Sequence, residues 1–120
     1  MEHNILGSPL IPCCTDPVTG YFRDGFCRTI SEDTGTHTVC AVVTQEFLDY
    51  SSSRGNDLMT ALPQWQFPGL KPGDKWCLCI SRWLEAEKVG KAPNIILEAT
   101  HEKTLQYTSL VLLQSYAVIS

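Results

Sequence analysis

Short apolar runs separated by stretches with helical spacing dominate the last two-thirds of this chain. Residues 36–44, THTVCAVVT, are β-branched and apolar, which is typical of a buried strand over about 38–43. Residues 76–80, WCLCI, and residues 94–99, NIILEA, have the same character and predict a second and a third strand. Each run leads into a stretch with helical spacing, so the pattern predicts three strand-helix units.

Hydroxyl residues mark the expected helix starts. Thr44, Ser81 and Thr100 each stand at the start of a helical stretch, and Ser109 is a candidate cap for a further helix. Serine and threonine are favoured at this position because the side-chain oxygen accepts a hydrogen bond from a free amide of the first turn. About fourteen residues lie between the second and third strands. This length suits a parallel crossover.

The layout predicts a single α/β or α+β domain over residues 1–120. We expect a short sheet of three or more strands, about three to four helices and a first third rich in loops, because prolines and glycines punctuate that segment. Within the domain, 36–58 forms a strand-helix unit and 76–117 a strand-helix-strand-helix unit. Residues 59–75 form a long ordered loop between the two units.

Charge and composition narrow the classes of function. Nine basic and thirteen acidic residues give a formal net charge of -4, and the basic residues are scattered. A nucleic-acid partner is not expected, because such proteins usually carry a basic stripe. A membrane partner is not expected either, since no segment approaches ~20 apolar residues. The start MEHNILGSPL lacks the features of a signal peptide, so we expect a cytoplasmic protein with reduced cysteines.

Several long stretches resemble a known bacterial family. They are GYFRDGFC, VCAVVTQEFL, RGNDL, FPGLKPGDKWCLCISRW and APNIILEATHEKTL. Together they resemble the uncharacterised family catalogued as domain of unknown function 2237, from about Asn4 to Ala117. The segment MTALP after Asp57-Leu58 departs from the Thr-Pro continuation associated with that family. The resemblance implies a soluble single domain and supplies no mechanism.

The cysteines are interpreted mainly as packing residues. Cys77 and Cys79 are two residues apart on a predicted strand, so their Cβ atoms would lie about 6.6 Å apart. That distance is too long for a disulfide between them and strained for a shared metal ion. No cofactor is evident, because the paired Cys-x2-Cys spacing of structural zinc sites is absent from the sequence. Zinc held by Cys77, Cys79, His37 and Cys40 is the alternative.

The stronger functional signal lies at the predicted helix starts. If the strands are parallel, Thr44, Ser81 and Thr100 gather at one edge of the sheet, where ligands bind in open α/β sheets. Helix N-termini favour anions. Arg82 follows one cap and would grip a carboxylate or phosphate, while His101 follows another and would be a neutral hydrogen-bonding partner.

The long loop would bring Asn56 and Asp57 to the same edge. The structural alternative is that these two residues form a turn whose side chains bond to their own backbone.

Three functions follow from these features. The leading hypothesis is a binding domain for a small anionic molecule. The second is a small enzyme that uses His101 as base or Cys27 as nucleophile, because Arg23 and Arg28 flank Cys27 and cations favour a thiolate. The third is a protein-interaction module or homodimer, in which the apolar tail 109–120 packs on the core or buries a dimer surface.

Overall fold

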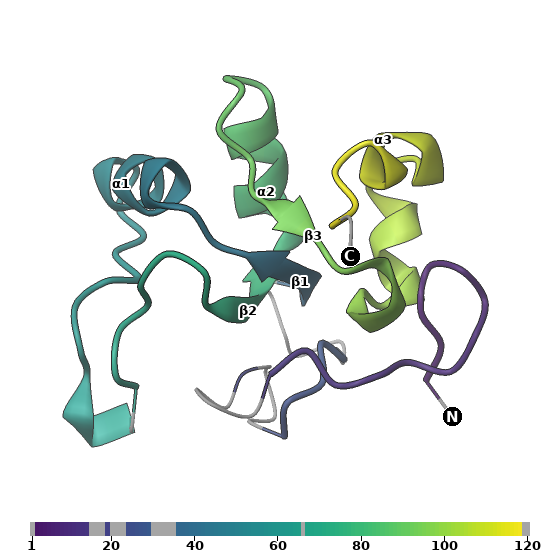
Figure 1. The fold of residues 1–120 in the computed structure, drawn as a ribbon, viewed down its shortest axis with the longest axis horizontal. Helices are drawn as coiled ribbons and strands as arrows, with labels where there is room; N and C mark the ends of the chain where they lie inside the picture. The colour runs from purple at the N-terminus through teal and green to yellow at the C-terminus, as the bar shows by residue number, and fades with distance from the viewer. Residues whose placement is uncertain (1, 15–18, 20–23, 30–35, 66, 119–120) are drawn as a thin grey trace.

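The computed structural model describes residues 2–14, 19, 24–29, 36–65 and 67–118. The described chain contains three strands, β1 (His37–Val42), β2 (Lys75–Cys79) and β3 (Asn94–Ile95). It also contains three α-helices, α1 (Gln45–Ser53), α2 (Ile80–Glu87) and α3 (Leu110–Gln114), shown in Figure 1. Short 3-10 helices cover Pro63–Trp65 (η1), Leu97–Ala99 (η2) and Glu102–Gln106 (η3). This is a small α+β domain, as the sequence predicts.

The sheet has the order β2-β1-β3, and both neighbours run antiparallel to β1. β2 and β3 are therefore parallel to each other, as expected for a strand-helix-strand crossover, but β1 lies between them in the opposite direction. The condition under which Thr44, Ser81 and Thr100 would share one edge, that all three strands are parallel, is therefore not met. Local sequence patterns indicate which residues form strands, whereas strand direction is decided by contacts distant in the sequence.

One face of the β1–β2 pair buries apolar side chains, and the other buries cysteines. Side chains alternate between faces along a strand, and the register places Val39 opposite Leu78 and Ala41 opposite Trp76. These residues belong to the main apolar core, which also contains Phe47 and Leu48 of α1 and Ile80 and Trp83 of α2. Cys40 lies opposite Cys77 in a second, smaller cluster. Figure 1 shows α1 and α2 on one side of this pair and the N-terminal segment on the other.

Two predicted helix caps are confirmed. The Thr44 hydroxyl accepts a hydrogen bond from the Phe47 amide (3.1 Å) at the start of α1. The Ser109 hydroxyl accepts one from the Leu112 amide (3.2 Å) at the start of α3. Both bonds satisfy amides that lack a partner inside the helix.

The other two predicted caps are wrong. The N-cap of α2 is Cys79, two residues before the expected Ser81, so Ser81 lies inside the helix. The third strand stops at Ile95, and Thr100 follows η2 instead of starting a helix. The Thr100 hydroxyl accepts a hydrogen bond from the Cys40 amide (3.2 Å) and donates one to the Ile96 carbonyl (2.9 Å). A hydroxyl used in this way ties the chain to β1 and is not available as a helix cap.

Four of the six cysteines form disulfides, which corrects the expectation of reduced cysteines. Cys13 is bonded to Cys40, and Cys27 is bonded to Cys77. All four bonded cysteines are buried, which agrees with the prediction that cysteines pack in the core. Two buried thiols that face each other at this distance also form a covalent bond when they are oxidised. The two partners from the loop-rich first third carry no periodic signal, so the sequence does not reveal the pairing. Cys77 and Cys79 do not bond to each other, as predicted.

The C-terminal segment packs on the core. Leu113 is fully buried, and the Tyr116 ring meets Trp83 edge-on with the ring centroids 5.0 Å apart. The Ile95 amide donates to the Tyr116 carbonyl (2.8 Å), and the Val118 amide donates to the Ile95 carbonyl (2.9 Å), so the chain pairs with β3. None of the helices in the described segments has the length and apolar character needed to cross a bilayer.

The long loop folds back on itself through one close backbone approach. The Leu70 amide donates to the Leu58 carbonyl (2.7 Å). Beside this bond, Gly69 has a φ of +82°, and a Cβ added there would lie 2.3 Å from the Met59 carbonyl oxygen. Gly73 also has a positive φ, of +94°, in the predicted 71–74 turn, but an added Cβ would meet nothing within 4 Å. Of these two glycines, only Gly69 is therefore required both by backbone conformation and by contact.

We predict that Gly69→Ala destabilises the fold more than Gly73→Ala. Both substitutions place a side chain at positive φ, which costs on the order of 1–3 kcal/mol. The clash with Met59 adds about 1–3 kcal/mol of overpacking at Gly69 alone. Urea unfolding followed by tryptophan fluorescence measures the difference. Equal free energies of unfolding for the two variants would contradict the close approach.

The disulfides predict a simple labelling pattern. Protein purified without reductant and then denatured should react with maleimide at two thiols, those of Cys14 and Cys79. After reduction, all six cysteines should react. Intact mass spectrometry counts the labels, and peptide mapping assigns them. Six labels before reduction would show that the pairs are not bonded.

Candidate functional site

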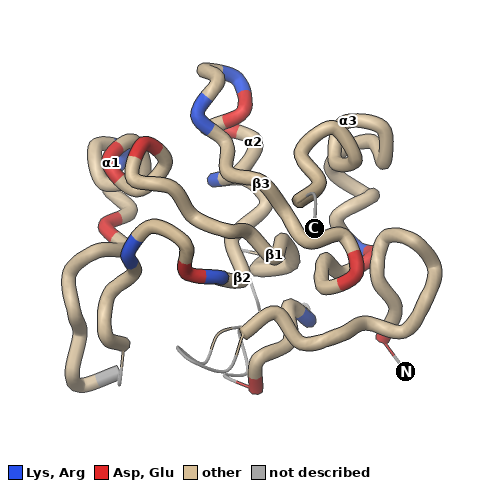
Figure 2. The backbone as a smooth tube through the Cα atoms, in the orientation of Figure 1, with Lys and Arg blue, Asp and Glu red and all other residues tan. Residues whose placement is uncertain are grey.

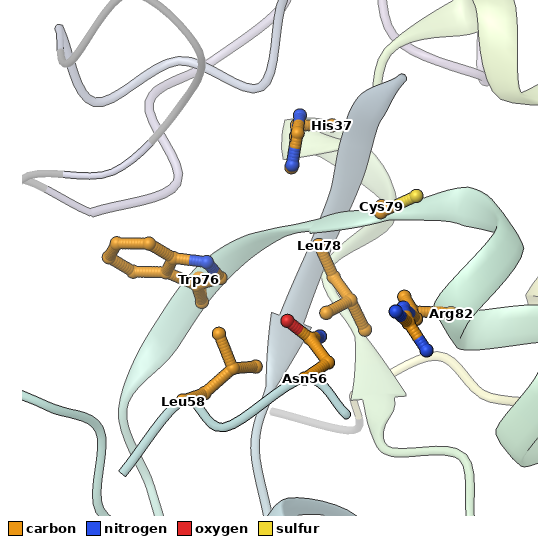
Figure 3. Close-up of a pocket in the computed structure, with 7 residues that line it drawn as sticks. All are labelled: His37, Asn56, Leu58, Trp76, Leu78, Cys79 and Arg82. Carbon is orange, nitrogen blue, oxygen red and sulfur yellow. The ribbon is translucent and has the colours of Figure 1, made fainter. Parts of the chain in front are cut away.

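A cavity of about 210 Å³ opens beside the end of β2 and the start of α2. It is lined by His37, Asn56, Leu58, Trp76, Leu78, Cys79 and Arg82. Figure 3 shows the residues coming from β1, β2, α2 and the stretch after α1. We call this the Arg82 cavity. It combines an apolar wall with a few polar groups, which is typical of small-molecule sites.

An irregular strand pairing positions one side of the cavity. His37 begins β1 and lies opposite Cys79, the last residue of β2. The register shifts between His37 and Val39, so one strand carries an extra residue at this point. Such irregularities bend a strand and redirect its side chains, and they are common beside functional sites. The shift lies where His37 joins the cavity wall.

Arg82 supplies the cationic group of the cavity. Its Nη1 donates to the Arg54 carbonyl oxygen (3.2 Å) and lies 3.5 Å from Glu85 Oε1. Arg54 Nε lies 3.5 Å from the other oxygen of the same Glu85 carboxylate. Two guanidinium groups thus share one carboxylate. Because exposed ion pairs at such distances are weak, this contact leaves Arg82 able to bind another anion.

Asn56 is held in place through its main chain. The Ser51 hydroxyl donates to the Asn56 carbonyl (2.8 Å), and the Asn56 amide donates to the Ser51 carbonyl (2.9 Å). Ser51 is buried on α1. These two bonds fix the backbone after the helix, and Figure 3 shows the Asn56 side chain turned toward Leu78.

Asp57 folds its own loop and does not line the cavity. Its Oδ1 accepts hydrogen bonds from the amides of Met59 (2.9 Å) and Thr60 (3.2 Å). The hydroxyl of Thr60, followed by the amide of Met59, lowers the pKa of the Asp57 carboxyl below its ordinary value. Asp57 therefore forms the turn that was the structural alternative to ligand binding.

Cys79 lies at the rim with its thiol engaged. Its Sγ is 3.0 Å from the Ser81 hydroxyl oxygen. In Figure 3 the sulfur points away from Leu58 and Asn56. The Cys79 thiol therefore does not point toward the centre of the cavity.

The structure separates the three predicted caps. Because β1 runs antiparallel to both neighbours, its carboxyl end and Thr44 lie at the opposite edge of the sheet from Ser81 and Thr100. Thr44, Ser81 and Thr100 are not cavity-lining residues. Of the predicted ligand-binding set, Arg82 and Asn56 meet at the cavity, together with His37 and Cys79 from the zinc alternative.

His101 anchors the N-terminal segment to the sheet. Its backbone amide donates to the Thr38 carbonyl (2.9 Å), and its Nδ1 accepts from the Lys103 amide (3.0 Å). Its Nε2 contacts the Glu2 carboxylate. Both ring nitrogens are thus engaged in a buried position, away from the Arg82 cavity.

The predicted nucleophile Cys27 and the predicted zinc ligands do not form a site together. Cys27 is fully buried in its disulfide, so in this state it offers no nucleophilic thiol. Its neighbour Arg28 pairs with Asp24 (2.8 Å), and Arg23 lies outside the described residues. The zinc alternative is divided, because Cys40 and Cys77 are in disulfides while His37 and Cys79 lie at the cavity.

Sequence reasoning missed the apolar wall formed by Leu58, Trp76 and Leu78. For two of these residues the sequence did contain a signal: Trp76 and Leu78 are two residues apart on a predicted strand and therefore face the same side.

A family model described as "Uncharacterized protein conserved in bacteria (DUF2237)" matches residues 3–117. The chain belongs to this family. The match spans nearly the whole chain and confirms the resemblance found in the sequence. No curated protein matches the chain. The DUF2237 description assigns no activity, so the function of this member is argued from its cavity and its chemistry.

Proposed function

We propose that the Arg82 cavity binds a small anionic ligand. The observation that carries this proposal is the guanidinium group of Arg82 at the wall of a cavity, in the first turn of α2. An arginine can hold a carboxylate or phosphate through two parallel hydrogen bonds. The free amides and the dipole at the start of a helix favour the same charge.

The local electrostatics support an anion. Arg54 and Arg82 bring two positive charges to the one negative charge of Glu85, although the chain as a whole has a net charge of -4. Figure 2 shows acidic and basic positions interspersed along the backbone. A local excess of positive charge on an acidic protein favours a small anion over a large polyanion such as nucleic acid, which binds an extended basic surface.

The size and lining of the cavity limit the ligand. A volume of about 210 Å³ is below the roughly 300–1,000 Å³ of sites for drug-sized molecules. Trp76 and Leu78 provide an apolar wall, and His37 and Asn56 provide polar contacts. This lining suits a short carboxylate or phosphate compound with a small apolar part.

The enzyme alternative has less support than binding. His101 is 7% exposed with both ring nitrogens engaged, and Cys27 is in a disulfide. Neither residue lies at the cavity. A general base needs access to the proton that it removes, and a nucleophile needs a thiolate.

Self-association is the second candidate function, because the C-terminal part exposes large apolar side chains. Val111 of α3 is 77% exposed and Tyr107 is 49% exposed. Leu105 and Val118 are also exposed. Exposed apolar patches mark interaction surfaces in many proteins, so these four side chains make the C-terminal part the candidate surface.

The binding proposal predicts that Arg82→Ala weakens anion binding at least tenfold with little change in melting temperature. Hydrogen bonds to a charged group contribute about 1.5–3 kcal/mol, and 1.4 kcal/mol corresponds to tenfold in affinity. Inorganic phosphate and succinate serve as probes, and amide chemical shifts followed by NMR report both affinity and location.

Arg54→Ala is the matched control, since it removes a positive charge from the same Glu85 without removing part of the cavity wall. Its affinity should stay within about threefold of the parent protein, because exposed charge pairs are worth ~1 kcal/mol or less. Unchanged binding by Arg82→Ala, or equal weakening by both variants, would argue against a site at this cavity.

Self-association predicts a dimer fraction that rises with protein concentration in sedimentation velocity experiments. Val111→Asp should abolish it, because a charge buried at an apolar interface is strongly unfavourable. Ala61→Asp is the control for added charge, since this exposed residue lies in the long loop. A parent protein that is monomeric at every concentration rules out this function.

A further inference from the structure

Four buried cysteines converge on one point behind the β1–β2 pair. Cys40 and Cys77 lie directly opposite each other on neighbouring strands. Cys13 and Cys27 reach them from the N-terminal segment, each bonded to one of the two. All four are 0–5% exposed, and Ala99 and Ile96 pack against them. We call this the four-cysteine cluster.

Three of the four sulfurs lie close enough together to share one metal ion. The Sγ atoms of Cys13, Cys27 and Cys77 lie within 4.8 Å of one another. The fourth sulfur, that of Cys40, is covalently bonded to Cys13. Four thiolates at about 2.3 Å from one zinc ion are about 3.8 Å apart. Three of the four sulfurs therefore already lie near this spacing. The Cys40 sulfur is not within 4.8 Å of all three, so it must separate from Cys13 and move toward Cys27 and Cys77 to complete the ligand set.

Convergence distinguishes this arrangement from simple cross-linking. Two disulfides that only fasten a loop to a sheet need not meet, and they hold it equally well at separate points. A single ion requires all of its ligands at one point. Thiolates are soft ligands that select ions such as Zn²⁺, and a closed set of four cysteines is the ligand set of structural zinc sites.

We propose that the reduced form of this protein binds one Zn²⁺ ion through Cys13, Cys27, Cys40 and Cys77 in place of the two disulfides. A dithiol reductant gives two electrons and two protons to each disulfide, so that two reductant molecules produce four protein thiols and two oxidised reductant molecules. One Zn²⁺ then displaces four protons and forms four Zn–S bonds. Two molecules of a small-molecule disulfide reverse the exchange: they accept four electrons from the four thiolates, take four protons from solvent and leave as four thiols, while the two protein disulfides re-form and the ion is released.

Both states hold the N-terminal segment against the sheet. In the disulfide form, each loop cysteine is bonded to one strand cysteine. In the zinc form, the ion connects all four. The reduced protein without metal loses these links and is the least stable of the three states, because metal binding and disulfides each stabilise the folded chain.

The test uses the full chain, reduced with dithiothreitol and desalted without oxygen. Titration with Co²⁺ should saturate at one ion per chain, with the thiolate charge-transfer bands and the d–d spectrum of a tetrahedral four-thiolate site. Zn²⁺ should displace Co²⁺ and raise the melting temperature of the reduced protein toward that of the oxidised protein. The oxidised protein should bind neither ion at this site.

Two double variants separate the cluster from the other cysteines. Cys14→Ser/Cys79→Ser keeps the four-cysteine cluster and should bind Co²⁺ with the same spectrum and stoichiometry. Cys27→Ser/Cys77→Ser keeps the Cys13–Cys40 disulfide when oxidised, which permits a check of folding by circular dichroism. After reduction it should bind at least 100-fold more weakly.

Three results would overturn the proposal. The first is the absence of thiolate-to-cobalt bands in the reduced parent protein. The second is loss of binding in Cys14→Ser/Cys79→Ser, and the third is metal binding that leaves the reduced chain at the melting temperature of its metal-free form.

Discussion

The pairing of Cys40 with Cys77 across β1 and β2 is the constraint on which the rest of the structure depends. A strand alternates its side chains, so this register sends the two cysteines to one face and their neighbours Val39 and Leu78 to the other. A slip of one residue would exchange the two faces completely. The same register therefore sets both the main apolar core and the position of the disulfides.

The disulfides explain how the described part of the first third is held on the domain. Their sequence separations of 27 and 50 residues correspond to a loss of unfolded-chain entropy worth about 3–4 kcal/mol each. Hydrogen bonds hold the same segment near the N-terminus, where the Asn4 side chain donates to the Glu98 carbonyl (3.0 Å). In the described part of this segment, covalent and polar links thus add to the apolar packing of Ile5, which belongs to the main core.

The sequence predicts local features of this fold better than long-range ones. The Thr44 cap and the helix after it depend on neighbouring residues, and both are confirmed. The direction of β1 depends on contacts with β2 and β3, and no local pattern records it. At the site, Arg82 and Asn56 were predicted on the condition that all three strands are parallel, which β1 does not meet, yet both line the cavity. They meet there because α2 starts directly at the end of β2, beside the stretch that follows α1.

Strand β2 contributes residues to both the Arg82 cavity and the four-cysteine cluster. Trp76 and Leu78 form a wall of the Arg82 cavity, and Cys77 between them is bonded to Cys27 behind the sheet. The disulfide form and the proposed zinc form both connect Cys77 to the N-terminal segment, so β2 is supported from behind in either state. Reduction without metal removes that support. We therefore expect an anion at the cavity to bind the two linked forms more tightly than the reduced metal-free form, because the links add to the β1 pairing that holds this wall.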